Sequence, residues 1–152
     1  MQALHSPAQA AQWLRQHVTG ALRTDSRAVQ PGDAFIAWPG AATDGRAYVA
    51  SAFSQGATAC LVEAQDCEPW QAKWQALTQQ PTAQLATYAG LKADTGWIAE
   101  AYYEQPSQSL KVLAVTGTNG KTSSTWWLAQ ALNALGIVNH NCLLYTSDAA
   151  DE

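Results

Sequence analysis

The residues whose types and spacing most clearly suit a chemical function lie in the stretch GTNGKTS, from Gly117 to Ser123. The apolar run LKVLAV precedes this stretch, and the run KTSSTWWLAQALNALG continues from it. Two glycines leave the backbone free to turn its amides toward an anion. The amino end of a following helix would add unpaired N–H groups and a positive dipole end. The pattern therefore predicts a strand, a phosphate-binding loop and a helix.

The side chains of this loop suit distinct roles at a phosphate group. Lys121 would reach the outer phosphates, and the Thr122 hydroxyl is placed for a Mg²⁺ ion that bridges them. The spacing departs from the general phosphate loop, because Val115 stands where that pattern requires a glycine. A turn that merely joins a strand to a helix is the alternative interpretation. The loop residues are Gly117, Thr118, Asn119, Gly120, Lys121, Thr122 and Ser123.

The bulk composition narrows the class of protein that carries this loop. Of 152 residues, 47% are hydrophobic and 13% charged, which is typical of a globular chain. A net charge of -4 with 8 Lys and Arg residues argues against a nucleic-acid-binding surface. No apolar run is long enough to span a bilayer, and the amino terminus lacks the pattern of a secretory signal. We therefore expect a cytoplasmic protein without membrane insertion, whose Cys60 and Cys67 are reduced, inert thiols.

The first seventy residues alternate between predicted strands and helices. Ser6 and Pro7 predict the start of a helix that runs to about His17. The segment 46–56 has helical spacing and ends at a glycine, and strands are expected on either side of it, at 34–38 and 58–63. This alternation indicates a small α/β layer.

The following segments have less regular signals. Residues 66–80 give no clear assignment, and residues 82–104 show a helical pattern with possible breaks at Gly90 and Gly96. The polar connector QPSQS, at 105–109, predicts a domain boundary after residue 107. The helix after the loop should end at Gly136. We expect its Trp126 and Trp127 to be buried in a core, and a platform for adenine is the alternative.

The compressed loop TGTNGKT resembles the ATP loop of the Mur ligase family, whose members add amino acids to the peptide of bacterial cell-wall precursors. Folylpolyglutamate synthetases share that loop, so the preceding segment decides between them. Three motifs there are similar to the UDP-binding domain of the ligase that adds the third residue, and the resemblance covers roughly residues 20 to 136. These motifs are Asp25-Ser26-Arg27, Pro31-Gly32-Asp33 with Phe35, and Asp44-Gly45.

The resemblance implies both a domain plan and a reaction. Residues 1–107 would form a small N-terminal α/β UDP-substrate domain, and 108–141 the first strand, P-loop and helix of a truncated ATPase domain. With ATP and Mg²⁺, such ligases convert a carboxylate into an acyl phosphate, which an amine attacks. The implied substrates are UDP-N-acetylmuramoyl-L-Ala-D-Glu and an amino acid, for which diaminopimelate is the expectation. Lys121 would be the catalytic residue of the ATP loop.

The resemblance also implies contacts to the UDP substrate. Thr24 and Ser26 would bind the uridine part, and the loop Ala41-Ala42-Thr43 would lie against the UDP-sugar. For Asp25 and Arg27, an intradomain ion pair and a substrate role are equally supported. Asp33 and Asp44 are expected to brace turns.

The end of the sequence departs from the family. Residues Cys142–Glu152 can be back-translated codon by codon into a transposase adapter used in sequencing libraries, so we expect a non-native tail on a fragment that is itself inactive. A natural strand followed by an acidic terminus is the alternative. Two other functions stay open: a stand-alone module that binds a UDP-sugar or nucleotide, and the Mur ligase that adds the terminal dipeptide.

Overall fold

The structure, a computed structural model, describes residues 1–77 and 83–139. The chain divides into two compact units, Met1–Leu110 and Lys111–Glu152. This division lies close to the boundary predicted after residue 107, while the functions predicted for the two parts stay predictions. The tail predicted at Cys142–Glu152 lies outside the described residues.

The first unit is built on a five-stranded sheet in which all pairings are parallel, with the order β1-β5-β4-β3-β2. Parallel strands need crossover connections, so helices cover the sheet and the carboxyl ends of the strands share one edge. The strands are β1 (Gln2–Leu4), β2 (Leu22–Arg23), β3 (Ala34–Ala37), β4 (Ala59–Glu63) and β5 (Gln84–Tyr88).

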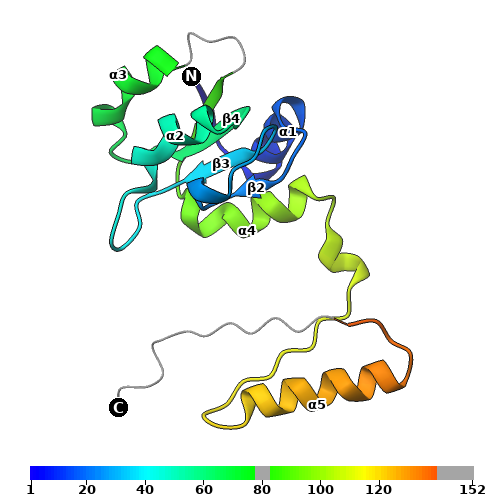
Figure 1. Ribbon diagram of the computed structural model, residues 1–152. Coiled ribbons are helices and arrows are strands. Elements are labelled where there is room, and N and C mark those ends of the chain that lie inside the picture. The colour runs from blue at the N-terminus through cyan, green and yellow to red at the C-terminus, as the bar shows by residue number, and fades with distance from the viewer. Residues whose placement is uncertain (78–82, 140–152) are drawn as a thin grey trace. The chain divides into compact units, whose positions relative to one another are not determined.

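Helices pack on both faces of this sheet and create two apolar cores (Figure 1). Helices α1 (Pro7–His17) and α4 (Leu91–Tyr102) cover one face, where Ile36 and Leu61 point. Helices α2 (Val49–Ser54) and α3 (Glu68–Leu77) cover the other, where Phe35 and Cys60 point. Three short 3-10 helices complete the unit: η1 (Ser26–Ala28), η2 (Gly45–Tyr48) and η3 (Pro106–Ser109).

Several local predictions are confirmed, including the α/β class. Ser6 caps α1, since its hydroxyl accepts a hydrogen bond from the amide of Gln9, and α1 ends at His17 as expected. β3 and β4 lie within the predicted strands. α2 ends before Gly56, whose φ of 100° is unfavourable for other residues.

The helical pattern predicted over 82–104 is wrong in its first part, where β5 is a strand. β5 lies between β1 and β4, so Leu85 enters one core while Ala86 and Tyr88 enter the other. A strand buried on both faces shows no alternation of apolar and polar residues. Periodicity alone therefore cannot distinguish it from a buried helical segment. Gly90, with φ of 76°, separates β5 from α4, whereas Gly96 lies inside α4 and does not break it.

Two further elements were not foreseen from the sequence. The short strand β1 pairs with β5 through Gln2, Ala3 and Leu4. Helix α3 occupies part of the unassigned segment, and Trp74 is its buried anchor in the second core. Both elements are defined by contacts with distant segments rather than by strong local signals.

The second unit contains α5 (Lys121–Ala134), and Gly136 follows its end with φ of 72°, as predicted. The strand predicted at 110–115 is wrong, because the described residues of this unit offer no neighbouring strand to pair with it. Trp126 and Trp127 are 51% and 66% exposed, so their expected burial is also wrong there. Among the described helices, none is long and apolar enough to cross a membrane.

Candidate functional site

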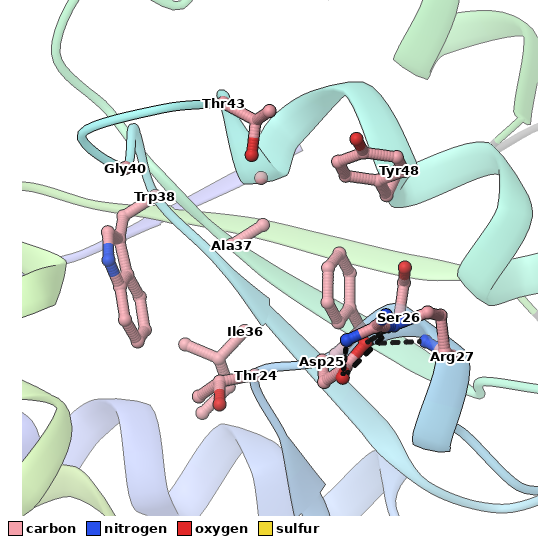
Figure 2. A pocket seen from close by; sticks show the side chains of 12 residues that line it. Thr24, Asp25, Ser26, Arg27, Ile36, Ala37, Trp38, Gly40, Thr43 and Tyr48 are labelled. Carbon is pink, nitrogen blue, oxygen red and sulfur yellow. Dashed lines mark hydrogen bonds and ion pairs between the residues drawn. The ribbon is translucent and has the colours of Figure 1, made fainter.

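A cavity of about 430 Å³ opens at the carboxyl ends of β2 and β3. In open parallel sheets, ligands bind at this edge because the loops there are free of pairing. In the view of Figure 2, Trp38 and Arg27 lie at opposite ends of the cavity, and Thr24 and Thr43 on opposite sides. The lining residues are Thr24, Asp25, Ser26, Arg27, Phe35, Ile36, Ala37, Trp38, Gly40, Thr43, Gly45 and Tyr48.

The first wall of the cavity is the segment Thr24–Arg27, directly after β2. Asp25 caps η1 by accepting the Arg27 amide at 3.0 Å, and its Oδ2 lies 2.7 Å from Nη2 of the same arginine. This charge-assisted pairing with Arg27 lowers the pKa of Asp25 to about 2. Of the two interpretations of these residues, the ion pair is present, while their contact with a substrate stays a prediction.

Asp33 stabilises this wall through hydrogen bonds to residues on either side of it. Its buried carboxylate accepts the amides of Ala21 at 2.7 Å and Gln30 at 3.1 Å, and Nε of Arg23 at 2.9 Å. Burial would raise the pKa of Asp33, but these hydrogen bonds outweigh it and lower the pKa. The expected bracing role is confirmed, and its consequence is that edge strand β2 is held beside the turn before β3. The hydroxyl of Tyr103 adds a bond from the Leu22 amide at 3.0 Å.

The second wall is the loop Pro39–Asp44, which follows β3. Pro39 and Asp44 form an antiparallel bridge, and the Gly40 amide donates to the Thr43 carbonyl at 2.9 Å. The loop closes where the Gly45 amide donates to the carbonyl of Trp38 at 3.0 Å. A Cβ on Gly45 would lie 2.9 Å from that carbonyl oxygen, so the closure requires glycine there.

Asp44 and Arg46 hold the end of this loop. Asp44 accepts the Arg46 amide at 2.9 Å and pairs with its guanidinium, with Oδ2 2.8 Å from Nη2. The hydrogen bond from this guanidinium is the largest influence on Asp44, and the pKa of the carboxyl is lowered. The predicted bracing role of Asp44 is confirmed, whereas Arg46 was not singled out by any pattern in the sequence.

The structure brings together three of the five residues predicted to contact the UDP substrate. Thr24, Ser26 and Thr43 line the cavity, whereas Ala41 and Ala42 are exposed at the loop tip and do not. Hydroxyl groups suit a ribose or a phosphate, since they both donate and accept hydrogen bonds.

Three aromatic lining residues, Phe35, Trp38 and Tyr48, were not predicted as site residues. Flat apolar rings beside hydroxyl groups suit a ligand with a planar ring and a polar remainder. The sequence position of Trp38 could have indicated a role in binding. It directly follows a buried strand, and the carboxyl end of such a strand commonly faces a ligand.

The predicted phosphate loop lies in the second unit and has the backbone that such a loop needs. Gly117 and Gly120 adopt φ of 150° and 75°. Gly120 precedes α5 without a side-chain cap, and a Cβ there would meet nothing within 4 Å. The amides of the first turn of α5, from Lys121 through Ser123, therefore point outward at the amino end of the helix. Nζ of Lys121 donates to the carbonyl of Gly117 within the same loop.

These features fit a bound nucleotide phosphate, since they combine backbone donors, a lysine and room for an anion. The predicted Mg²⁺ contact rests on the hydroxyl of Thr122, which lies in the first turn of the same helix. Within residues 1–77 and 83–139, no cluster of three or more His, Cys, Asp or Glu residues is arranged to hold a metal ion. Thr122 would therefore meet a Mg²⁺ ion whose other ligands are phosphate oxygens or water.

Comparison with known proteins addresses the origin of this arrangement. The description "Mur ligase family, catalytic domain" matches residues 19–89, which include both walls of the cavity. A UDP-N-acetylmuramoyl-L-alanyl-D-glutamate--2,6-diaminopimelate ligase from Acidovorax sp. (strain JS42) is 57% identical over 138 residues, or 89% of this chain. The chain belongs to the Mur ligase family. The resemblance inferred from the motifs is thereby confirmed.

Other Mur ligases with the same name align with most of the chain. The relative from Janthinobacterium sp. (strain Marseille) is 45% identical over 82% of the chain, and that from Coxiella burnetii is 41% identical over 77%. The chain spans only about a quarter of the length of these relatives, with 26% of the Acidovorax protein and 23% of the Janthinobacterium protein covered.

Proposed function

We propose that this chain supplies the UDP-substrate domain and the ATP loop of a ligase that adds diaminopimelate to UDP-N-acetylmuramoyl-L-Ala-D-Glu. The identity of 57% over 138 residues to a ligase named for this reaction carries the proposal. In this scheme residues 1–107 hold the nucleotide end of the substrate, and 108–141 begin the ATP-binding domain. The substrates are soluble metabolites, and we expect the reaction to take place in the cytoplasm.

The cavity at β2 and β3 is the proposed site for the uridine diphosphate part. Its aromatic residues offer a surface to the uracil ring, and the hydroxyls of Thr24, Ser26 and Thr43 offer partners to ribose and phosphate. Arg27 adds a guanidinium group, which suits a diphosphate. Ala41 and Ala42 do not line the cavity, so their proposed contribution is limited to backbone contact with the sugar.

The loop from Gly117 to Ser123 is the proposed site for the phosphates of ATP. The amides of Gly120, Lys121 and Thr122 would surround the phosphate groups, and Thr118, Asn119 and Ser123 would complete the loop. ATP, when bound with Mg²⁺, supplies the phosphoryl group that activates a carboxylate for attack by an amine. Lys121 would exchange its bond to the Gly117 carbonyl for the phosphates and neutralise negative charge there.

A chimera tests this assignment in a protein that contains every domain. Residues of this chain would replace the 138 matching residues of the Acidovorax ligase. We expect the chimera to form the tripeptide product when it is given ATP, diaminopimelate and the UDP-dipeptide. Lys121→Ala should lower kcat by ~100-fold or more, as does removal of other groups that stabilise transition-state charge.

Binding measurements separate the two proposed sites in the same chimera. The Kd for UDP in Lys121→Ala should equal that of the unmodified protein, because Lys121 lies in the other unit. Near-normal ligation by Lys121→Ala would refute the role of this lysine. If UDP failed to compete with the UDP-dipeptide, the cavity would lose its proposed ligand.

A further inference from the structure

Arg46 is a buried cation that no proposed binding step uses. Its residue is only 5% exposed, whereas arginines of globular proteins are mostly exposed. It is not among the residues that line the cavity at β2 and β3. An arginine is buried only when its charge and its donors are satisfied, so the contacts of this side chain indicate what it does.

The guanidinium group of Arg46 joins two separate segments of the chain. On one side, Nε and Nη2 pair with the carboxylate of Asp44, with Nη2 2.8 Å from Oδ2. On the other side, Nη1 lies 2.5 Å from the carbonyl oxygen of Gln65 and 3.3 Å from that of Asp66. The carbonyl of Glu63 lies at the limit of hydrogen bonding, 3.5 Å away. The bonds thus tie the end of the loop Pro39–Asp44 to the segment that follows β4.

That second segment is itself firmly attached to the sheet and to α4. The buried carboxylate of Glu63 accepts the amide of Gly90 at 3.1 Å and that of Leu91 at 2.8 Å, at the amino end of α4. It also accepts the Gln65 amide at 3.2 Å. Arg46 therefore anchors an exposed loop to a rigid part of the fold.

The anchored loop forms one wall of the cavity. Gly40 and Thr43 contribute to the lining, and both belong to the short exposed loop between Pro39 and Asp44. The bridge between Pro39 and Asp44 closes this loop, and Asp44 is the residue that forms the ion pair with Arg46. Without that ion pair, the loop would keep its closure but lose its attachment to the segment that follows β4.

We propose that Arg46 is a positioning residue for the UDP-bearing substrate, which holds the loop Pro39–Asp44 in the conformation that presents Thr43 to the cavity. This inference rests on the proposed function, in which the cavity binds uridine diphosphate. A guanidinium group is required because it has five donors in one plane, which serve a carboxylate on one edge and carbonyl oxygens on the other. A lysine at this position keeps the charge, but its three donors share one nitrogen and cannot reproduce the two donating edges of the guanidinium plane.

Titration of UDP into the 152-residue chain and its variants tests the inference. In Arg46→Lys, the binding-competent loop conformation becomes one among several, and if a tenth of molecules retain it the Kd rises about tenfold. The control is Arg15→Lys, which makes the same chemical change at an exposed position of α1, on the face of the sheet opposite α2. This control should leave the Kd for UDP unchanged.

The stoichiometry distinguishes positioning from folding. A variant that only unfolds part of the protein lowers the number of sites per chain, whereas a displaced loop raises Kd at full stoichiometry. In the chimeric ligase, Arg46→Lys should raise KM for the UDP-dipeptide while KM for ATP and kcat stay within about twofold, because only binding of the UDP substrate is affected. Asp44→Asn breaks the same attachment from the loop side and should also raise the Kd for UDP.

The outcomes separate the inference from the proposed function. UDP binding by Arg46→Lys with the Kd of the unmodified chain would overturn the inference and leave the proposed function intact. If Arg46→Lys lowers the number of sites, Asp44→Asn decides, and an unchanged Kd in that variant overturns the inference. Failure of the unmodified chain to bind UDP would overturn both.

Discussion

Replacing Asp33 by asparagine should destabilise the fold more than any other single change of a carboxylate to its amide at the first wall of the cavity. The carboxylate accepts three hydrogen bonds, from the amides of Ala21 and Gln30 and from Nε of Arg23, at 2.7 to 3.1 Å. Asparagine keeps one acceptor oxygen but places an NH₂ group where the second oxygen was. The amide can turn so that its oxygen keeps the Gln30 and Arg23 bonds while its NH₂ group faces the Ala21 amide, and in the reverse orientation the Gln30 and Arg23 bonds are lost instead.

The magnitude therefore lies between the loss of one bond and the loss of two. Hydrogen bonds to a charged group contribute about 1.5–3 kcal/mol each. The Arg23 side chain is 36% exposed, so water replaces much of its lost partner and its contribution is at the low end. We therefore expect Asp33→Asn to lower the free energy of unfolding by about 2–3 kcal/mol.

Urea denaturation of the chain, followed by tryptophan fluorescence, measures this change. The matched control is Asp25→Asn in the exposed ion pair with Arg27, which should cost much less than Asp33→Asn because water screens the pair. Asparagine also retains the capping of η1 at that position. Equal losses in the two variants, or a loss below about 1 kcal/mol at Asp33, would refute the bracing role of the buried carboxylate.

The pH dependence provides an independent check on the same prediction. The hydrogen bonds outweigh burial and lower the folded-state pKa of Asp33, so its contribution to stability is present above the unfolded-state pKa of about 3.9. The contribution is lost as the pH falls through the folded-state value. The difference in stability between the unmodified chain and Asp33→Asn should therefore shrink below about pH 3.9, and a constant difference down to pH 2 would contradict the assignment.

Three other predictions concern packing in the first unit. Gly56→Ala should lower stability by about 1–3 kcal/mol, because φ is 100° and the added Cβ would lie 2.9 Å from Cα of Pro31. Gly96→Ala, in α4 with nothing within 4 Å of the added Cβ, should instead stabilise by about 0.5–1 kcal/mol, and urea denaturation compares the two. Cys60 should react with a thiol reagent only after unfolding, because burial raises its pKa. Rapid labelling of Cys60 in the native chain, located by mass spectrometry, would contradict this.

The sequence by itself determined those elements whose signals are local. The cap at Ser6, the stop at Gly56, and the glycines of the phosphate loop act on their immediate neighbours, so the residue types are sufficient to place them. The family motifs were equally readable, because Thr24, Ser26 and Thr43 belong to short contiguous stretches. Their assembly around one cavity followed only from the parallel order of β2 and β3.

The tertiary structure decided the features that depend on distant partners. β5 is a strand because β1 and β4 bury both of its faces, and its own sequence imitates a helix. The expected strand at 110–115 shows the converse, since an apolar run forms a strand only when another strand accepts its hydrogen bonds. In the sequence Arg46 only opens the segment with helical spacing at 46–56, whereas the carbonyl groups that bury it come from Gln65 and Asp66. A hydrogen bond between segments nineteen or twenty residues apart leaves no mark on either segment alone.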